Sequence, residues 1–159
     1  MALLAFLLSP ACRQGPLPGR PSGAHVLIIG LDGADWDRMK PMMEQGRLPA
    51  LADLVKRGAS AKMAVDRPPL SPLLWNTVAT GRPPDEHGVL NFVEYDPRVG
   101  KMIPISGRRR RVKALWNLAD DAGLTSVTLG WWATWPAEEV RGAMVSDRWS
   151  YSPVPLPAD

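Results

Sequence analysis

Ser71 and Asp32 are the residues of this 159-residue chain whose types and positions could do chemistry. Ser71 is followed by Pro72 and a short apolar run, the pattern of a helix that begins with a capping serine. A hydroxyl at a helix N-terminus also faces free N–H groups and the positive end of the helix dipole, which suits a phosphate. Ser71 is therefore either a helix cap or a nucleophile, and the two roles are compatible.

A nucleophilic role requires activation, because a serine hydroxyl is a weak nucleophile at neutral pH without a base or a metal ion. The chain has two histidines, of which His25 precedes the first predicted strand and His87 lies in a turn. A Ser-His-Asp triad therefore has little support, and activation by a metal remains. Asp32 follows a buried apolar run, where open α/β sheets bind ligands, so it is either a metal ligand or the cap of the next helix.

Apolar runs predict the strands that would position these side chains. Three stretches have the pattern of buried strands: residues 25–33, 60–66 and 124–132. Residues 92–105 predict a hairpin around Asp96–Gly100. Because helical patterns separate the buried strands, we expect an α/β fold with a mostly parallel sheet flanked by helices.

Apolar residues at helical spacing predict the intervening helices. Residues 36–45 have this spacing, although Pro41 predicts a kink or two short pieces. The segment after Ser71 predicts a helix that Gly81 ends. Residues 111–122 place apolar side chains on one stripe before Gly123. These helices carry Ser71 and cover the predicted sheet.

The overall charge gives little support for a nucleic-acid polymer as partner. The net charge of +3 comes from 19 basic and 16 acidic residues, and the surplus is concentrated in the run Arg108–Arg111. That run could steer an anionic substrate, but a solvated loop before a helix is the better interpretation. Trp131, Trp132 and Trp135 could form a stacking wall, although packing is the more common role of such residues.

The first 23 residues have the pattern of a leader and a flexible tether, which leaves residues 24–159 as the folded part. The opening apolar stretch is too short to span a bilayer and resembles a secretory signal. Cys12 lies where a bacterial lipoprotein carries its lipid. We therefore expect localisation to the bacterial cell envelope or periplasm, with a possible lipid anchor at Cys12. A cytoplasmic protein with an inert thiol is the alternative.

Three motifs taken together resemble a known family. Asp32 stands in an Asp-Gly pair, Ser71 precedes Gly81 by ten residues, and the segment from Thr80 to Val89 reads TGRPPDEHGV. This combination is similar to the type I phosphodiesterase and nucleotide pyrophosphatase branch of the alkaline phosphatase superfamily. The resemblance covers about residues 25–149.

The resemblance implies a two-zinc enzyme in which Asp32 binds one ion and Ser71 both binds zinc and attacks phosphorus. A phosphoserine intermediate would then be hydrolysed by water. His87 belongs to the turn motif and is expected to be structural rather than a ligand. The phosphate-binding Asn of the family aligns with Phe92, so Asn91 is offered as substrate-binding residue one position early.

The remaining zinc ligands of the family lie in Asp-His motifs of a C-terminal half, which this chain does not contain up to Asp159. We therefore expect an N-terminal fragment of a metal-dependent hydrolase of phosphodiesters or related phosphate esters, inactive by itself. Two alternatives remain open. One is a non-catalytic envelope domain that keeps the fold for binding, and the other is a phosphomonoesterase or phosphotransferase of the same superfamily.

Overall fold

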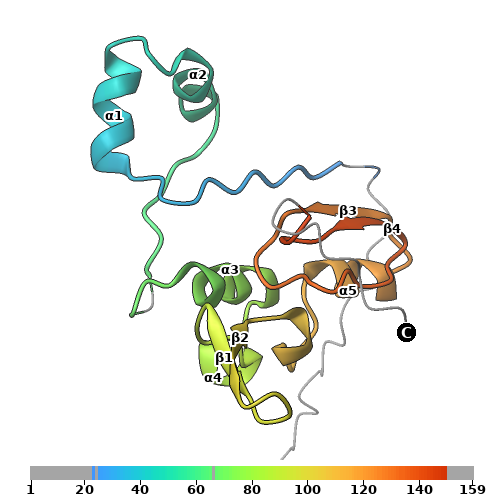
Figure 1. Ribbon diagram of the computed structural model, residues 1–159. Helices are drawn as coiled ribbons and strands as arrows, with labels where there is room; N and C mark the ends of the chain where they lie inside the picture. The colour runs from blue at the N-terminus through green and yellow to red at the C-terminus, as the bar shows by residue number, and fades with distance from the viewer. Residues whose placement is uncertain (1–22, 24, 66, 150–159) are drawn as a thin grey trace, which may run out of the picture.

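The computed structural model describes residue 23 and residues 25–65 and 67–149 of the chain. It shows short helices and two small sheets (Figure 1). The helical segments are α1 (Trp36–Glu44), α2 (Pro49–Arg57), α3 (Ser71–Thr80), α4 (Pro84–His87), the 3₁₀ turn η1 (Gly107–Arg109) and α5 (Leu115–Asp121). The strands are β1 (Val93–Asp96), β2 (Lys101–Pro104), β3 (Ser126–Leu129) and β4 (Gly142–Val145). The leader and Cys12 lie outside the described residues.

Local signals explain the first two helices. Asp35 caps α1, because its side chain accepts a hydrogen bond of 2.8 Å from the N–H of Asp37. Pro49 begins α2, where a missing N–H costs nothing. Of the two outcomes predicted for Pro41, a kink or two short pieces, the second is wrong, since α1 is one helix of nine residues. Neither helix has a buried residue.

Helix α3 covers the predicted residues and ends as expected. Gly81 has φ of 63°, a left-handed conformation that glycine adopts without steric cost, and its N–H bonds to the carbonyl of Thr77. The start differs from the prediction. Leu70 is the N-cap, Ser71 is the first helical residue, and no side chain caps the helix. The interpretation of Ser71 as a helix cap is therefore wrong.

The predicted hairpin and the third predicted strand are both present. Strands β1 and β2 pair antiparallel and are joined by a turn in which the N–H of Gly100 bonds to the carbonyl of Asp96. Strand β3 forms within residues 124–132 and pairs parallel with β4. Helices and short sheets thus make a small α/β structure, in agreement with the expected class.

A mostly parallel sheet flanked by helices is not confirmed. Each sheet has two strands, and only β3 and β4 run parallel. Residues 25–33 form no strand, and the described part of residues 60–66 forms none either. The expectation that residues 25–33 are buried is wrong, because Val26 is 84% exposed and Ile29 is 71% exposed. A strand requires a neighbour for its backbone groups, and none pairs with this segment within the described residues.

The core lies in the second half of the described chain. One cluster joins Ala79 on α3 to Ala114 and Trp116, with Trp131 packed against it. A second cluster consists of Val89, Ile105 and Ala133. These contacts tie α3 to the segments around α5 and β3, so Ser71 begins a helix that is anchored in the core. Among the described residues, no helix has the length and apolar character that a membrane span requires.

Candidate active site

Ser71 and Asp32 meet although 39 positions separate them in the sequence. The hydroxyl of Ser71 donates a hydrogen bond of 3.3 Å to Oδ1 of Asp32. Asp32 lies in the turn that follows the extended segment 25–31, and Gly33 in this turn has φ of 72°. The two residues that the sequence singled out for chemistry are thus in direct contact.

Neither Ser71 nor Asp32 caps a helix with its side chain. Ser71 directs its hydroxyl to a carboxylate rather than to the backbone of its own helix. Asp32 does not cap α1, because Asp35 does so. Both side chains are therefore available to each other and to a ligand. A carboxylate beside a hydroxyl is a donor set that a divalent metal ion can bind.

A third side chain reaches the same carboxylate. The indole Nε1–H of Trp75 donates a hydrogen bond of 3.4 Å to Oδ1 of Asp32. Trp75 lies one helical turn after Ser71, so both side chains project from the same face of α3. The sequence analysis did not identify Trp75, although its spacing of four residues from Ser71 was a usable signal.

His87 is structural, as the motif implied. Its ring is fully buried, and Nε2 lies 3.1 Å from the hydroxyl oxygen of Thr77 on α3. Nδ1 accepts a hydrogen bond of 3.1 Å from the N–H of Val89, so Nε2 carries the proton that bonds to Thr77. The imidazole therefore joins the TGRPPDEHGV segment to α3 and has no ring nitrogen left for a metal ion.

Asn91 has an exposed side chain whose Oδ1 accepts a hydrogen bond of 2.8 Å from the N–H of Phe92. No hydrogen bond joins it to Asp32, Ser71 or Trp75 in the described residues. Phe92 packs edge-on against Trp132 at 5.3 Å between ring centroids. The phosphate-binding role of Asn91 stays a prediction.

The described residues do not assemble a metal site. Asp32 and Ser71 bring two oxygen atoms together, whereas a zinc site uses at least three protein ligands. Within residues 25–65 and 67–149, no group of three His, Cys, Asp or Glu side chains is placed to hold an ion. The chemistry of the two oxygen donors fits one edge of a metal site and does not complete it.

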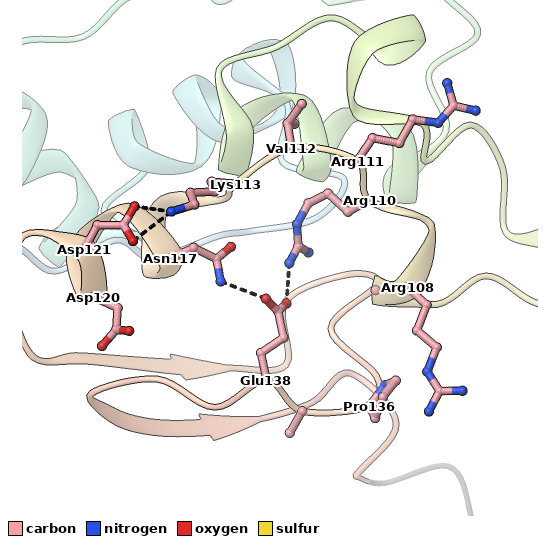
Figure 2. Close-up of a pocket in the computed structure, with 12 residues that line it drawn as sticks. Arg108, Arg110, Arg111, Val112, Lys113, Asn117, Asp120, Asp121, Pro136 and Glu138 are labelled. Atoms are coloured by element: carbon pink, nitrogen blue, oxygen red, sulfur yellow. Dashed lines mark hydrogen bonds and ion pairs between the residues drawn. The ribbon is translucent and has the colours of Figure 1, made fainter.

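A cavity lies at the predicted arginine loop. It has a volume of about 510 Å³ and is lined by residues of 107–113, α5 and 136–138 (Figure 2). Figure 2 shows Arg110 pointing toward Glu138, while Arg108 and Arg111 point away from that pair. Lys113 binds Asp121 on the rim. The cations that point inward are thus already paired with carboxylates.

Arg110 corrects the expectation that the run Arg108–Arg111 is solvated. Its side chain is 4% exposed, forms an ion pair with Glu138 and lies over the ring of Trp116 at 4.9 Å. Asn117 donates a further hydrogen bond of 2.8 Å to Glu138. Burial raises the pKa of Glu138, but the hydrogen bonds from Arg110, Asn117 and Trp116 outweigh burial and leave the pKa below its usual value.

The aromatic residues of the GWWATWP segment pack rather than form an open wall. Trp131 meets both Trp75 and Trp116 edge-on, at 5.3 and 6.1 Å between ring centroids. Arg148 lies over the ring of Trp135 at 4.3 Å. The packing role expected for these tryptophans is confirmed for the contacts described.

Comparison with known proteins identifies the class. The family model of type I phosphodiesterase / nucleotide pyrophosphatase matches residues 26–155. The chain therefore belongs to this family of the alkaline phosphatase superfamily, as the motifs implied. No curated protein and no solved structure matches the chain significantly.

Proposed function

We propose that this chain carries the nucleophile of a zinc-dependent hydrolase of phosphodiesters or related phosphate esters. The family is one of phosphoester hydrolases that act on small molecules and are typically metal-dependent. The observation that supports a catalytic rather than a structural Ser71 is its 3.3 Å hydrogen bond to Asp32. A serine needed only to begin a helix would bond to the backbone of that helix.

In this proposal, Ser71 attacks phosphorus through Oγ and the ester oxygen of the leaving group departs. The Oγ–P bond forms as the P–O bond to the leaving group breaks, and water later hydrolyses the phosphoserine. Asp32 and Ser71 would hold one edge of the zinc site. A bound ion would favour loss of the Ser71 proton and offset charge on the phosphoryl oxygens.

The other zinc ligands are proposed to come from further sequence, in line with the Asp-His motifs that the family resemblance implies. The experiment therefore uses the complete gene product with zinc and bis-p-nitrophenyl phosphate as substrate. Ser71→Ala should abolish turnover, because no other hydroxyl contacts Asp32 in the described residues. Ser60→Ala, at an exposed loop position, is the matched control. Wild-type turnover in Ser71→Ala would remove the nucleophile assignment.

The ligand assignment has its own measurement. Asp32→Asn should lower the bound zinc per chain, measured by elemental analysis after dialysis, because an amide is a poorer zinc ligand than a carboxylate. Asp35→Asn is the control, since Asp35 caps α1 and lies three positions away. Equal zinc content in the wild type and Asp32→Asn would exclude Asp32 from the ligand set. If the zinc content of the complete gene product depends on neither Asp32 nor Ser71, the result would favour the non-catalytic binding domain.

A further inference from the structure

Trp75 connects the two halves of the candidate site. Its Nε1–H and the hydroxyl of Ser71 both point to Oδ1 of Asp32, at 3.4 and 3.3 Å. The other carboxylate oxygen, Oδ2, has no hydrogen-bond partner among the described residues. One oxygen of Asp32 is thus held from α3, and the second is left for a ligand.

The indole of Trp75 is itself held in place by the core. Trp131 donates a hydrogen bond of 3.0 Å from its Nε1 to the backbone carbonyl of Trp75. The two rings meet edge-on, with an interplanar angle of 82°. Trp131 in turn packs against the cluster that contains Trp116. The position of the Trp75 ring therefore follows from the packing of α3 and not from Asp32 alone.

The same ring supports the backbone that leads into Asp32. A Cβ atom added at Gly30 would lie 2.8 Å from Cη2 of Trp75, closer than real Cβ contacts allow. Gly30 is not among the glycines with positive φ, so its backbone conformation does not require glycine. Glycine is required here because the indole of Trp75 lies too close to leave room for a side chain. Trp75 thus contacts Gly30 in the extended segment through its ring edge. It also contacts Asp32, which follows that segment, through Nε1.

We propose that Trp75 is a positioning residue that holds the Asp32 carboxylate against the Ser71 hydroxyl and keeps Oδ2 free. The consequence for catalysis rests on the proposed function, whereas the link between Trp75, Gly30 and Asp32 does not. The segment 25–31 has exposed side chains and no strand partner in the described residues, so few other contacts locate Asp32. Trp75 on α3 therefore sets how the Asp32 carboxylate lies relative to the Ser71 hydroxyl.

The first test is spectroscopic and needs no activity. In ¹H–¹⁵N spectra of the chain, Trp75→Phe identifies the Trp75 indole resonance by its loss. Asp32→Ala should shift that resonance and speed its exchange with water, because the acceptor is gone. The Trp131 indole, bonded to a backbone carbonyl, is the internal control and should stay in place. An unmoved Trp75 resonance in Asp32→Ala would overturn the proposal.

Gly30→Ala provides a second, independent variant. The added methyl group must displace the Trp75 ring, so the same resonance should shift while Asp32 and its carboxylate are still present. Ser71→Ala leaves Trp75 and Asp32 intact and should leave the Trp75 indole bonded. If Gly30→Ala leaves the Trp75 resonance unchanged, the ring does not support this backbone and the proposal fails.

The functional test uses the complete gene product. Trp75→Phe removes the N–H that bonds to Asp32 and also the outer ring atoms that lie against Gly30. Zinc affinity should therefore fall by about 10- to 100-fold, as for other partners that orient metal ligands. Unfolding midpoints equal to the wild type would separate this loss from a folding defect. Wild-type zinc affinity in a folded Trp75→Phe would overturn the positioning role. Inactivity of the wild type would instead contradict the proposed function and leave the spectroscopic result standing.

Discussion

Residues 25–65 and residues 70–149 have similar apolar patterns, yet only the later residues bury side chains. No described residue of 25–65 is buried, and Val26, Leu27 and Ile29 in its apolar segment 25–31 are largely exposed. Residues 70–149 contain both core clusters. The comparison shows that an apolar run predicts the need for a partner and not the presence of one.

The candidate site lies where these two regions meet. Asp32 belongs to the open region, whereas Ser71 and Trp75 lie on α3, the first helix of the packed region. The hydrogen bonds to Oδ1 and the contact at Gly30 therefore join Asp32, which few contacts hold in place, to Ser71, which lies on a helix anchored in the core. Pairs of variants, one in residues 25–65 and one in residues 70–149, can test this difference in packing.

The largest contrast is expected between a buried and an exposed apolar side chain. Trp116→Ala should lower the free energy of unfolding by about 3 to 5 kcal/mol, because it empties the centre of one cluster. Leu27→Ala should change it by less than about 0.5 kcal/mol, since Leu27 is exposed. Urea denaturation measures both. A large loss in Leu27→Ala would show that the first region is packed in solution.

A smaller contrast is expected between two ion pairs. Arg110→Ala should cost about 1.5 to 3 kcal/mol of unfolding free energy, because it removes a buried donor from Glu138 and a cation from the ring of Trp116. Arg57→Ala removes an exposed pair with Asp53 on α2 and should cost about 0.3 to 0.5 kcal/mol. Equal losses in the two variants would contradict the buried position of Arg110.

Two helix starts should respond differently to loss of a polar side chain. Asp35→Ala removes the cap of α1 and should destabilise that helix by about 0.5 to 2 kcal/mol. Ser71→Ala removes no cap, so its effect on unfolding should stay below about 0.5 kcal/mol. Circular dichroism during urea titration follows both helices. If Ser71→Ala lowered the free energy of unfolding by as much as the loss of a helix cap, the capping interpretation of Ser71 would be restored.

The smallest effect is a pH dependence. The pKa of Glu138 is lower in the folded chain than its ordinary value of 4.5, so the ionised form stabilises the fold. This contribution is fully present above the unfolded pKa and is lost as the pH falls through the lower folded pKa. The stability difference between wild type and Glu138→Gln should therefore shrink below about pH 4.5. A difference that grows on acidification would reverse the assigned direction.

Sequence patterns predicted the parts of the fold that depend on neighbours in the chain. The helix that Gly81 ends, the hairpin between β1 and β2, and strand β3 all form where predicted. The predicted strands at residues 25–33 and 60–66 do not form among the described residues, because pairing needs a second segment at the right distance. The expectation that the run Arg108–Arg111 is solvated was wrong for a similar reason. Arg110 is buried by Glu138 and Trp116, which come from elsewhere in the chain.

By itself the sequence determined the family, the types of the candidate site groups and the end of α3 at Gly81, because these depend on residue identity and short spacing. The tertiary structure decided that Ser71 bonds to Asp32 across 39 positions and that Trp75 reaches the same oxygen across 43. It also decided which apolar segments are covered. The physical reason is that a hydrogen bond or a buried contact depends on distance in space, which packing sets and spacing along the chain does not.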